Sequence, residues 1–311
     1  MAIKKYATQY LPSWTKLTPF QIKGIAIKDA CAAFWAAKGR PNFRSRKGSS
    51  QSCFIPKSAI KPNAIYPRIL GKVLNYKEPL PDYLCDSRLL WRNGNWFLCA
   101  SHKEKIVQEA RTKPVTVALD PGIRTFVSFY SPSYSGNIGV DTSKKMFNYF
   151  LALDNLYSQI AKAKNKRKKR NLRKAAMRLR EKIHNLITEL HYKTANFLCK
   201  NFSTIILPKF ETKDMANKMT RKIRSKSVRA MLGLSFYKFR QKLEWIALKM
   251  GCNVIITTEE YTSKTHPQTG VINNQLGGAK TITLVDGSRA DRDIVGAFNI
   301  LLKTLVVDTP A

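Results

Sequence analysis

The stretch that decides the fold reads VTVALDPGIRTFVSFY and spans residues 115–130. Its first five residues form an unbroken apolar run of the kind that builds buried strands, and an Asp-Pro-Gly turn ends that run. A second apolar run follows at once. We therefore predict a strand, an acidic turn at Asp120 and a second strand, with a third short strand near residues 137–140 completing a meander.

Helical and strand-like segments alternate downstream. Helical spacing holds from residue 144 to 202, STIIL (203–207) is strand-like, and an amphipathic helix then ends at Gly251. CNVIITTEEY (252–261) contains another core strand, and GSRADRDIVGAFNILLKTL (287–305) predicts a final helix. The order strand–strand–strand–helix–strand–helix–strand–helix is that of the α/β RNase H-like fold, a mixed sheet with helices.

The upstream part of the chain predicts a helix joined to a small antiparallel barrel or sheet. Apolar residues recur at helical spacing over residues 18–37, after a Thr-Pro pair that suits a helix start. Strand-like runs are YPRILGKVL (66–74), SRLLWR (87–92) and NWFLCAS (95–101). The Asn-Gly pair between the last two predicts a hairpin, and the polar segment 101–114 predicts a domain boundary.

The chain is strongly basic. Its 311 residues hold 55 Lys and Arg against 20 Asp and Glu, a net charge of +35. Nucleic acid is the partner this charge favours, with an anionic membrane surface as the competitor. Residues 161–180 alone contain eleven Lys and Arg and no acid, and apolar residues at helical spacing continue through and beyond this stretch. We predict a helical hairpin there with one buried face and one basic face.

Membrane insertion and secretion are not expected. No run of about 18 uninterrupted apolar residues occurs, and the first residues lack the apolar block of a signal peptide. The six cysteines are scattered singly, without CxxC spacing. They indicate reduced intracellular thiols rather than disulfides or a metal site.

Carboxylates gather at the ends of predicted core elements, although acids are scarce in this chain. Asp120 follows the first strand, Glu259 and Glu260 follow the last, and Asp291 and Asp293 open the final helix. Converging carboxylates repel unless divalent cations bind between them, and two Mg²⁺ ions held in this way hydrolyse phosphodiesters. The ordinary alternatives are a turn for Asp-Pro-Gly and a helix cap for the later aspartates.

These motifs together resemble a known family. VALDPGIRTFVSFY is similar to the first RuvC motif of the TnpB/Fanzor family of transposon-encoded, RNA-guided DNA endonucleases, and EEYTSKT followed by RADRDIVGAFNIL is similar to its last strand, zinc-ribbon start and third RuvC motif. The resemblance covers about residues 15–305. It implies a Mg²⁺-dependent RuvC nuclease with three acids, a guide RNA on the basic surfaces and a DNA target.

The resemblance also assigns the acids. Asp120 matches the first and Asp293 the third, which leaves Asp291 as a cap or a supporting residue. Pro208 stands where most of the family carries the second acid. As in Fanzor proteins, we expect Glu259 to substitute for it, with Glu211 as the alternative. Alternation along the strand turns the neighbouring Glu260 away.

Domain boundaries follow from the same resemblance. Residues 1–110 are expected to form a wedge and recognition-like nucleic-acid-binding region with a truncated N-terminus, and residues 111–262 and 288–306 the RuvC nuclease domain. Residues 263–287 would be an altered zinc-ribbon insertion that binds the target nucleic acid. Its four ligand positions hold one histidine, one aspartate and two threonines, so no structural zinc is expected. These positions are His266, Thr269, Thr283 and Asp286.

The resemblance further implies nucleic-acid contacts from eight cations: Arg124, Lys166, Arg167, Lys168, Lys169, Arg170, Arg173 and Lys264. Two alternatives to a guided nuclease stay open. One is a catalytically inactive or truncated RNA- and DNA-binding derivative of the family, and the other is an unguided RuvC-like nuclease that acts on DNA structure. The expected location is the nucleus for a eukaryotic or viral chain and otherwise the cytoplasm.

Overall fold

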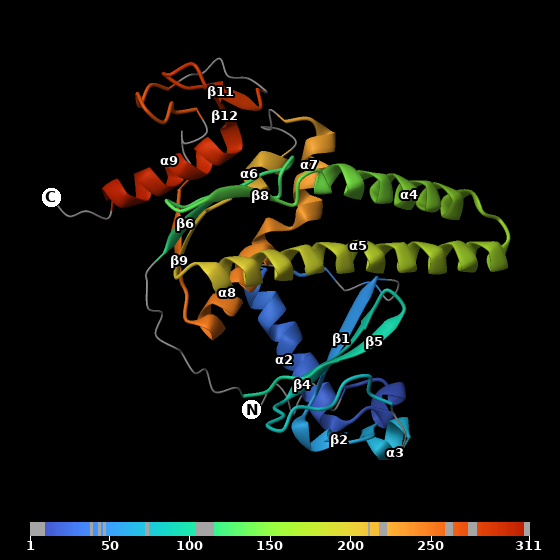
Figure 1. The fold of residues 1–311 in the computed structure, drawn as a ribbon. Coiled ribbons are helices and arrows are strands. Elements are labelled where there is room, and N and C mark those ends of the chain that lie inside the picture. Colours follow the sequence, from blue (N-terminus) through green and yellow to red (C-terminus); the bar gives the residue numbers. More distant parts are fainter. Residues whose placement is uncertain are drawn as a thin grey trace. The chain divides into compact units, whose positions relative to one another are not determined.

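The chain is a mixed α/β protein of two compact units, residues 1–105 and 106–311 (Figure 1). None of the helices in the described part of the chain is long and apolar enough to span a bilayer. The computed structural model describes residues 10–37, 40–42, 45, 48–71, 75–103, 115–210, 212–217, 223–258, 264–272 and 279–307.

Unit 1 combines the predicted helix with a three-stranded antiparallel sheet. Strand β4 lies between β1 and β5, and α2 packs against β1. The predicted hairpin is confirmed, since Asn93 and Gly94 turn with φ values of 49° and 90°. The elements are η1 (Ser13–Leu17), α2 (Phe20–Ala36), β1 (Ser50–Ile55), η2 (Lys57–Ala59), β2 (Ile60–Lys61), β3 (Ala64–Ile65), α3 (Pro67–Leu70), β4 (Ser87–Arg92) and β5 (Asn95–Cys99).

One expectation for unit 1 is wrong. The strand expected in YPRILGKVL is a helical turn over Pro67–Leu70, where the amides of Ile69 and Leu70 donate to the carbonyl of Tyr66. Pro67 has no amide to donate to a neighbouring strand, and its fixed φ suits the first position of a helix. Of the two predicted alternatives, barrel or sheet, the described strands form the open sheet, with β1 and β5 at its opposite edges.

Unit 2 is built on a five-stranded mixed sheet in the order β10-β9-β6-β7-β8. Strands β10, β9 and β6 run parallel, and the meander β6, β7 and β8 is antiparallel. The predicted order of elements is confirmed. The sheet strands are β6 (Thr116–Pro121), β7 (Val127–Tyr130), β8 (Ser135–Ile138), β9 (Thr204–Pro208) and β10 (Asn253–Thr257), followed by the small pair β11 (Thr281–Thr283) and β12 (Arg289–Asp291).

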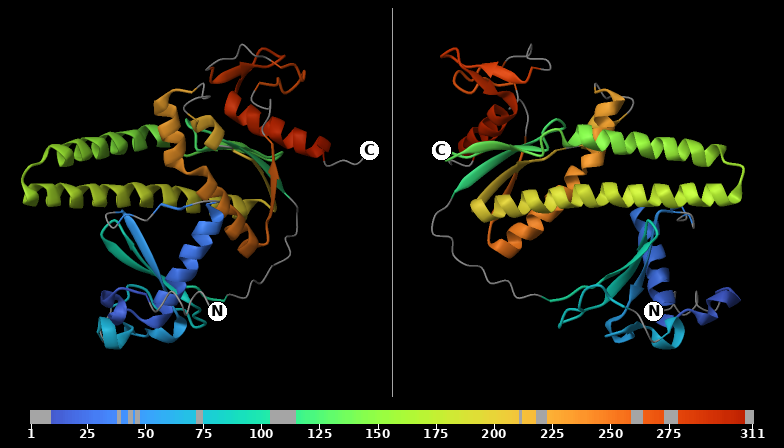
Figure 2. Two further views of the ribbon diagram at one scale, coloured as in Figure 1. Left: turned by 180° about the vertical axis from the view of Figure 1, so that it is seen from behind. Right: turned by 45° about the vertical axis from the view of Figure 1, so that its right-hand side comes forward.

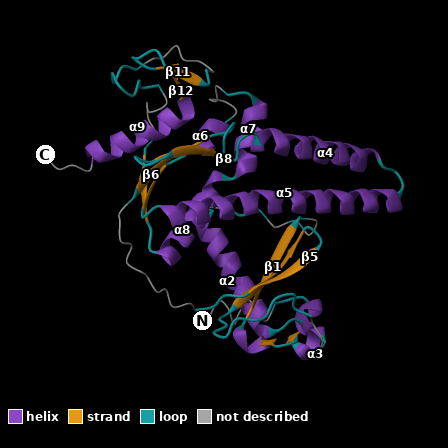
Figure 3. Ribbon diagram, in the orientation of Figure 1, coloured by secondary structure: helices purple, strands orange, loops and turns teal. Residues whose placement is uncertain are grey.

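Helices cover both faces of this sheet (Figure 3). Alternation along β6 sends Val117 and Leu119 into the large core with α5 and α8, and it sends Ala118 to the opposite face against Ile300 and Leu301 of α9. Asp120 therefore belongs to the α9 face. The helices are α4 (Thr142–Lys162), α5 (Lys166–Asn201), α6 (Thr212–Ala216), α7 (Ser225–Leu234), α8 (Phe236–Met250) and α9 (Arg292–Val307).

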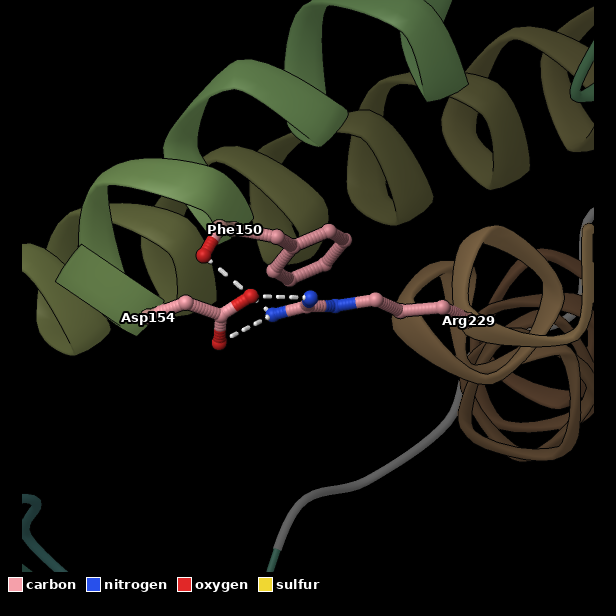
Figure 4. Close-up of polar contacts among 3 residues, drawn as sticks. All are labelled: Phe150, Asp154 and Arg229. Carbon is pink, nitrogen blue, oxygen red and sulfur yellow. Dashed lines mark hydrogen bonds and ion pairs between the residues drawn. The ribbon is translucent and has the colours of Figure 1, made fainter. Parts of the chain in front are cut away.

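Helices α4 and α5 form the predicted hairpin, and Figure 2 shows them side by side as they run out from the sheet. Helix α7 is joined to α4 of this hairpin through an ion pair. The Arg229 guanidinium donates both to the Asp154 carboxylate and to the carbonyl of Phe150, whose ring it also covers (Figure 4). This pairing lowers the pKa of Asp154.

A neutral histidine lies in the large core of unit 2. His191 of α5 is 1% exposed and stacks on Phe126, with 5.4 Å between ring centroids. Its Nε2 donates to the carbonyl of Leu234, 2.8 Å away, because a carbonyl can only accept. Burial lowers the pKa of His191 to about 4, so the ring is neutral in the folded protein at pH 7.

We expect unit 2 to lose stability as the pH falls from 7 to 5. Over this window unfolded chains protonate His191 near its ordinary pKa while the folded chain does not, so acid favours unfolding. The contribution is about 2 kcal/mol at pH 5. Urea unfolding at both pH values, for the wild type and His191→Gln, checks it. An equal pH dependence in both proteins would show that His191 is not the group responsible.

Candidate active site

Asp120 is held against helix α9. It sits near the end of β6, two residues beyond the buried Ala118, so its side chain points to the face that α9 covers. Gly296 of α9 makes this approach possible. A Cβ atom at position 296 would meet Oδ2 of Asp120 more closely than non-bonded atoms can approach. The absence of a side chain at Gly296 therefore lets the carboxylate lie on the helix backbone.

Asp293 lies in the first turn of α9. It is three residues before Gly296, and positions with this spacing share one face of a helix. Asp120 and Asp293 are therefore brought to the same side of α9 from distant parts of the chain. Burial raises the pKa of Asp293, the neighbouring Asp291 adds to the rise, and Arg292 and Arg124 oppose it. Arg124, a predicted nucleic-acid contact, thus acts electrostatically on the candidate acid.

Asp291 is the cap of α9, one of the two roles expected for it. Its Oδ1 accepts the backbone N–H of Asp293 at 2.9 Å, the hydrogen bond that an N-cap carboxylate makes with the second helical residue. The cap holds the first turn of the helix and so the backbone that carries Asp293.

The second acid falls outside the described residues. Pro208 ends β9 and pairs with Thr257 of β10. On the other side of β9, Ile206 pairs with Ala118 of β6 in a parallel register. Two residues further along both strands, Pro208 is therefore level with Asp120. Both candidates, Glu259 and Glu211, lie outside the described residues, as does Glu260. Within the described ranges no three His, Cys, Asp or Glu side chains are grouped to hold a metal ion.

A cavity of about 480 Å³ opens where β6 and β9 end. Pro121 and Pro208 line it from the sheet, and Tyr237 and Arg240 line it from α8. Arg240 is paired with Glu244 at 2.8 Å, while Tyr237 is largely exposed. Tyr237 and Arg240 have no sequence signal that marks them as functional, because their helical spacing matches that of ordinary surface positions.

The expected zinc-ribbon positions are occupied by a hydrogen-bonded loop. Nδ1 of His266 accepts the amides of Gln268 and Thr269, and Nε2 donates to the carbonyl of Thr283 at 3.2 Å. Asp286 accepts from the amide and hydroxyl of Ser288. Both ring nitrogens of the histidine are therefore engaged within the loop. The expectation that this segment binds no zinc stays a prediction.

The basic face of the hairpin is exposed. Nine of the eleven cations between residues 161 and 180 have exposed side chains, and Lys169 and Arg180 are half-buried. Asn165 caps α5 by accepting the amides of Arg167 and Lys168, which begins the helix at its most basic stretch. The other two predicted contacts, Arg124 and Lys264, are exposed and lie far from the hairpin in the sequence.

Comparisons with known proteins give the family. The chain is 33% identical over 252 residues to the putative transposase A625R of Paramecium bursaria Chlorella virus 1, an alignment that covers 79% of this chain and 57% of the relative. It is 31% identical over 192 residues to the TnpB-like protein L79 of Acanthamoeba polyphaga mimivirus, with 59% of this chain and 36% of the relative covered. The family model of the Cas12f1-like TNB domain matches residues 236–300.

The chain belongs to the TnpB family. This TnpB-family chain spans about half the length of the curated relatives it matches. Its fold is similar to that of Cas12f1 in a solved complex with sgRNA and target DNA, with a TM-score of 0.53 and 16% identity. The alignment covers 90% of this chain and 70% of that one. At such identity the likeness concerns the fold alone.

Proposed function

We propose that this TnpB-family chain is a Mg²⁺-dependent, RNA-guided DNA endonuclease of a transposable element, with unit 2 as an RNase H-like RuvC nuclease. One observation carries the proposal: Asp120, far from α9 in the sequence, lies against Gly296, a glycine that makes room for its carboxylate on the same side of α9 as Asp293. A chain with a net charge of +35 is suited to hold a phosphodiester against two such acids.

Asp120, Asp293 and Glu259 (or Glu211) would hold the metal. Carboxylate oxygens are the ligands that Mg²⁺ prefers. Burial and, after it, the charge of Asp291 raise the pKa of Asp293, and a bound cation would favour the ionised carboxylate there. Bound Mg²⁺ would supply the Lewis acid for phosphodiester hydrolysis. The contribution of the chain is to fix both aspartates and to place Arg124 next to them, where its guanidinium can bind a phosphate.

The basic face of the hairpin is the proposed site for the guide RNA. Exposed Lys and Arg along a helix contact phosphates without reading sequence, which suits RNA held by its shape. Exposed Lys264 and the loop 263–287 would contact the target DNA. For a chain related to proteins of large viruses, the proposed location is the nucleus of the host cell.

A second candidate is an inactive RNA- and DNA-binding derivative of the family. The replaced zinc ligands, with His266 bound inside its own loop, favour it. One experiment separates the two functions. The protein is purified with its bound RNA, the RNA is sequenced, and DNA matching its variable end is incubated with the complex and Mg²⁺. Cutting of matched DNA alone supports the nuclease, and RNA binding without cutting supports the derivative. Cutting without RNA indicates an unguided enzyme.

Replacing Arg167, Lys168, Lys169 and Arg170 with Gln should weaken RNA binding and flatten its dependence on salt. Each lost phosphate contact lowers the slope of log K against log salt by up to about 0.9 for a duplex, and by less for single strands. Filter binding at several salt concentrations measures the slope. The matched control replaces Lys193 and Lys200, later on α5, with Gln. An unchanged slope in the fourfold variant would place the RNA elsewhere.

The second acid can be assigned by three isosteric changes. We expect Glu259→Gln to remove DNA cleavage as completely as loss of Asp120, while Glu211→Gln and Glu260→Gln keep most activity. Glu259 comes two residues after Thr257, which pairs with Pro208, and Pro208 lies level with Asp120 in the parallel register. Cleavage lost in Glu211→Gln and kept in Glu259→Gln would reverse the assignment.

A further inference from the structure

Three polar side chains lie in one row across the meander. In the antiparallel register Asp120 of β6 faces Ser128 of β7, and Ser128 faces Asn137 of β8. Directly opposed residues of antiparallel strands project on the same side of the sheet. The row therefore runs from the first candidate acid to the edge of the sheet on the face that α9 covers, since α9 contacts all three strands.

A chain of hydrogen bonds continues this row onto α9. The Ser128 hydroxyl lies 2.6 Å from Oδ1 of Asn137, and Nδ2 of Asn137 donates to Oδ2 of Asp291 at 3.0 Å. The other oxygen of Asp291 accepts the amide of Asp293. Ser128 is fully buried, whereas Asn137 is exposed.

The directions of these bonds are determined by chemistry. An ionised carboxylate can only accept, so Asn137 must turn its NH₂ group to Asp291 and its carbonyl to Ser128. Ser128 then has to donate. Each side chain therefore has one orientation in which all the hydrogen bonds form. Turning any one of these groups round would bring two donors or two acceptors together.

We infer that Ser128, Asn137 and Asp291 are positioning residues that fix the first turn of α9 on the sheet so that Asp293 meets Asp120. This inference rests on the proposed metal site. A cap alone would hold the helix backbone but leave the helix free to shift along the sheet. The second oxygen of Asp291 removes this freedom, because it ties the cap to the row that contains Asp120.

We call the hydrogen-bonded residues Ser128, Asn137 and Asp291 the relay. The metal affinity of the protein, measured without any nucleic acid, tests their role. Mn²⁺ binding to the full chain is followed by electron paramagnetic resonance, and thermal unfolding is recorded for each variant. Asn137→Ala removes the link without changing charge, and we expect about a tenfold weaker Mn²⁺ affinity. The melting temperature should change little, because Asn137 is exposed.

A double exchange provides the rescue. In Asn137→Asp with Asp291→Asn the carboxylate and the amide exchange positions, and the net charge is unchanged. Every donor again meets an acceptor. The Ser128 hydroxyl and the new amide at position 291 both donate to the new carboxylate at position 137, and the backbone N–H of Asp293 donates to the amide oxygen at position 291. Affinity within about threefold of wild type is expected. The control Glu189→Gln removes an exposed acid that pairs with Lys193 on α5, outside the row, and should leave Mn²⁺ affinity unchanged.

The possible outcomes distinguish a failure of the positioning role from a failure of the proposed metal site. Wild-type binding that Asp120→Ala abolishes supports the metal site. Unchanged affinity in Asn137→Ala, or a double exchange as weak as Asn137→Ala, overturns the relay and leaves the site standing. A wild-type chain that binds no Mn²⁺ overturns the proposed metal site and the relay with it.

Discussion

Asp120→Ala and Asp293→Ala should each lower the rate of DNA cleavage at least about a thousandfold, a loss of about 4 kcal/mol of transition-state stabilisation. Each change removes a carboxylate from the pair that would hold Mg²⁺. Nucleic-acid affinity should stay close to wild type, because the Lys and Arg contacts to phosphate are untouched. Single-turnover cleavage of matched DNA and filter binding at fixed salt measure the two quantities.

The control for this pair is Glu189→Ala, which removes an exposed acid of α5, the helix that packs on the sheet face opposite α9. It should cleave at the wild-type rate. Cleavage near the wild-type rate in either candidate variant would refute the assignment, whereas loss of both cleavage and binding would indicate a folding defect that circular dichroism can detect.

Gly296→Ala should lower cleavage about a hundredfold while the protein stays folded. The added methyl group takes the place that Oδ2 of Asp120 occupies, so the carboxylate must move by about an ångström. Alanine also favours the helix over glycine by about 1 kcal/mol, which offsets the cost of the clash. The free energy of unfolding should therefore change little, as measured with urea, while the single-turnover cleavage rate falls.

Gly233→Ala is the matched control on α7. Its methyl group would meet the Phe150 ring of α4, which lies under Arg229 and is not part of the candidate site. This variant should lose stability and keep cleavage in the folded fraction. If Gly296→Ala behaves in the same way, the close approach of Asp120 to α9 has no role in the reaction.

Much of unit 2 could be predicted from the sequence, because the signals are local. Apolar runs of four or five residues mark its strands, and helical spacing marks the hairpin and the final helix. The position of Asp120 at a strand end and of Asp291 at a helix start follows from the same signals. Strand order could then be inferred, since few arrangements connect such a succession of elements.

The error in unit 1 has a local cause as well. Residues 66–74 are apolar enough for a strand, but Pro67 and the positive φ of Tyr66 begin a helical turn in which Ile69 and Leu70 stay exposed. A short apolar run does not by itself distinguish the two conformations.

The fold class, the basic face of the hairpin and two of the candidate acids can be predicted from the sequence. How these parts contact one another is known only from the folded structure. The contact of Gly296 with Asp120, the hydrogen bond from Asn137 to Asp291 and the stacking of His191 on Phe126 all join residues far apart in the chain. Spacing along the sequence reveals which side of its own element a residue occupies. It does not reveal which residue of another element lies opposite, because register and helix docking are settled by packing over the whole core.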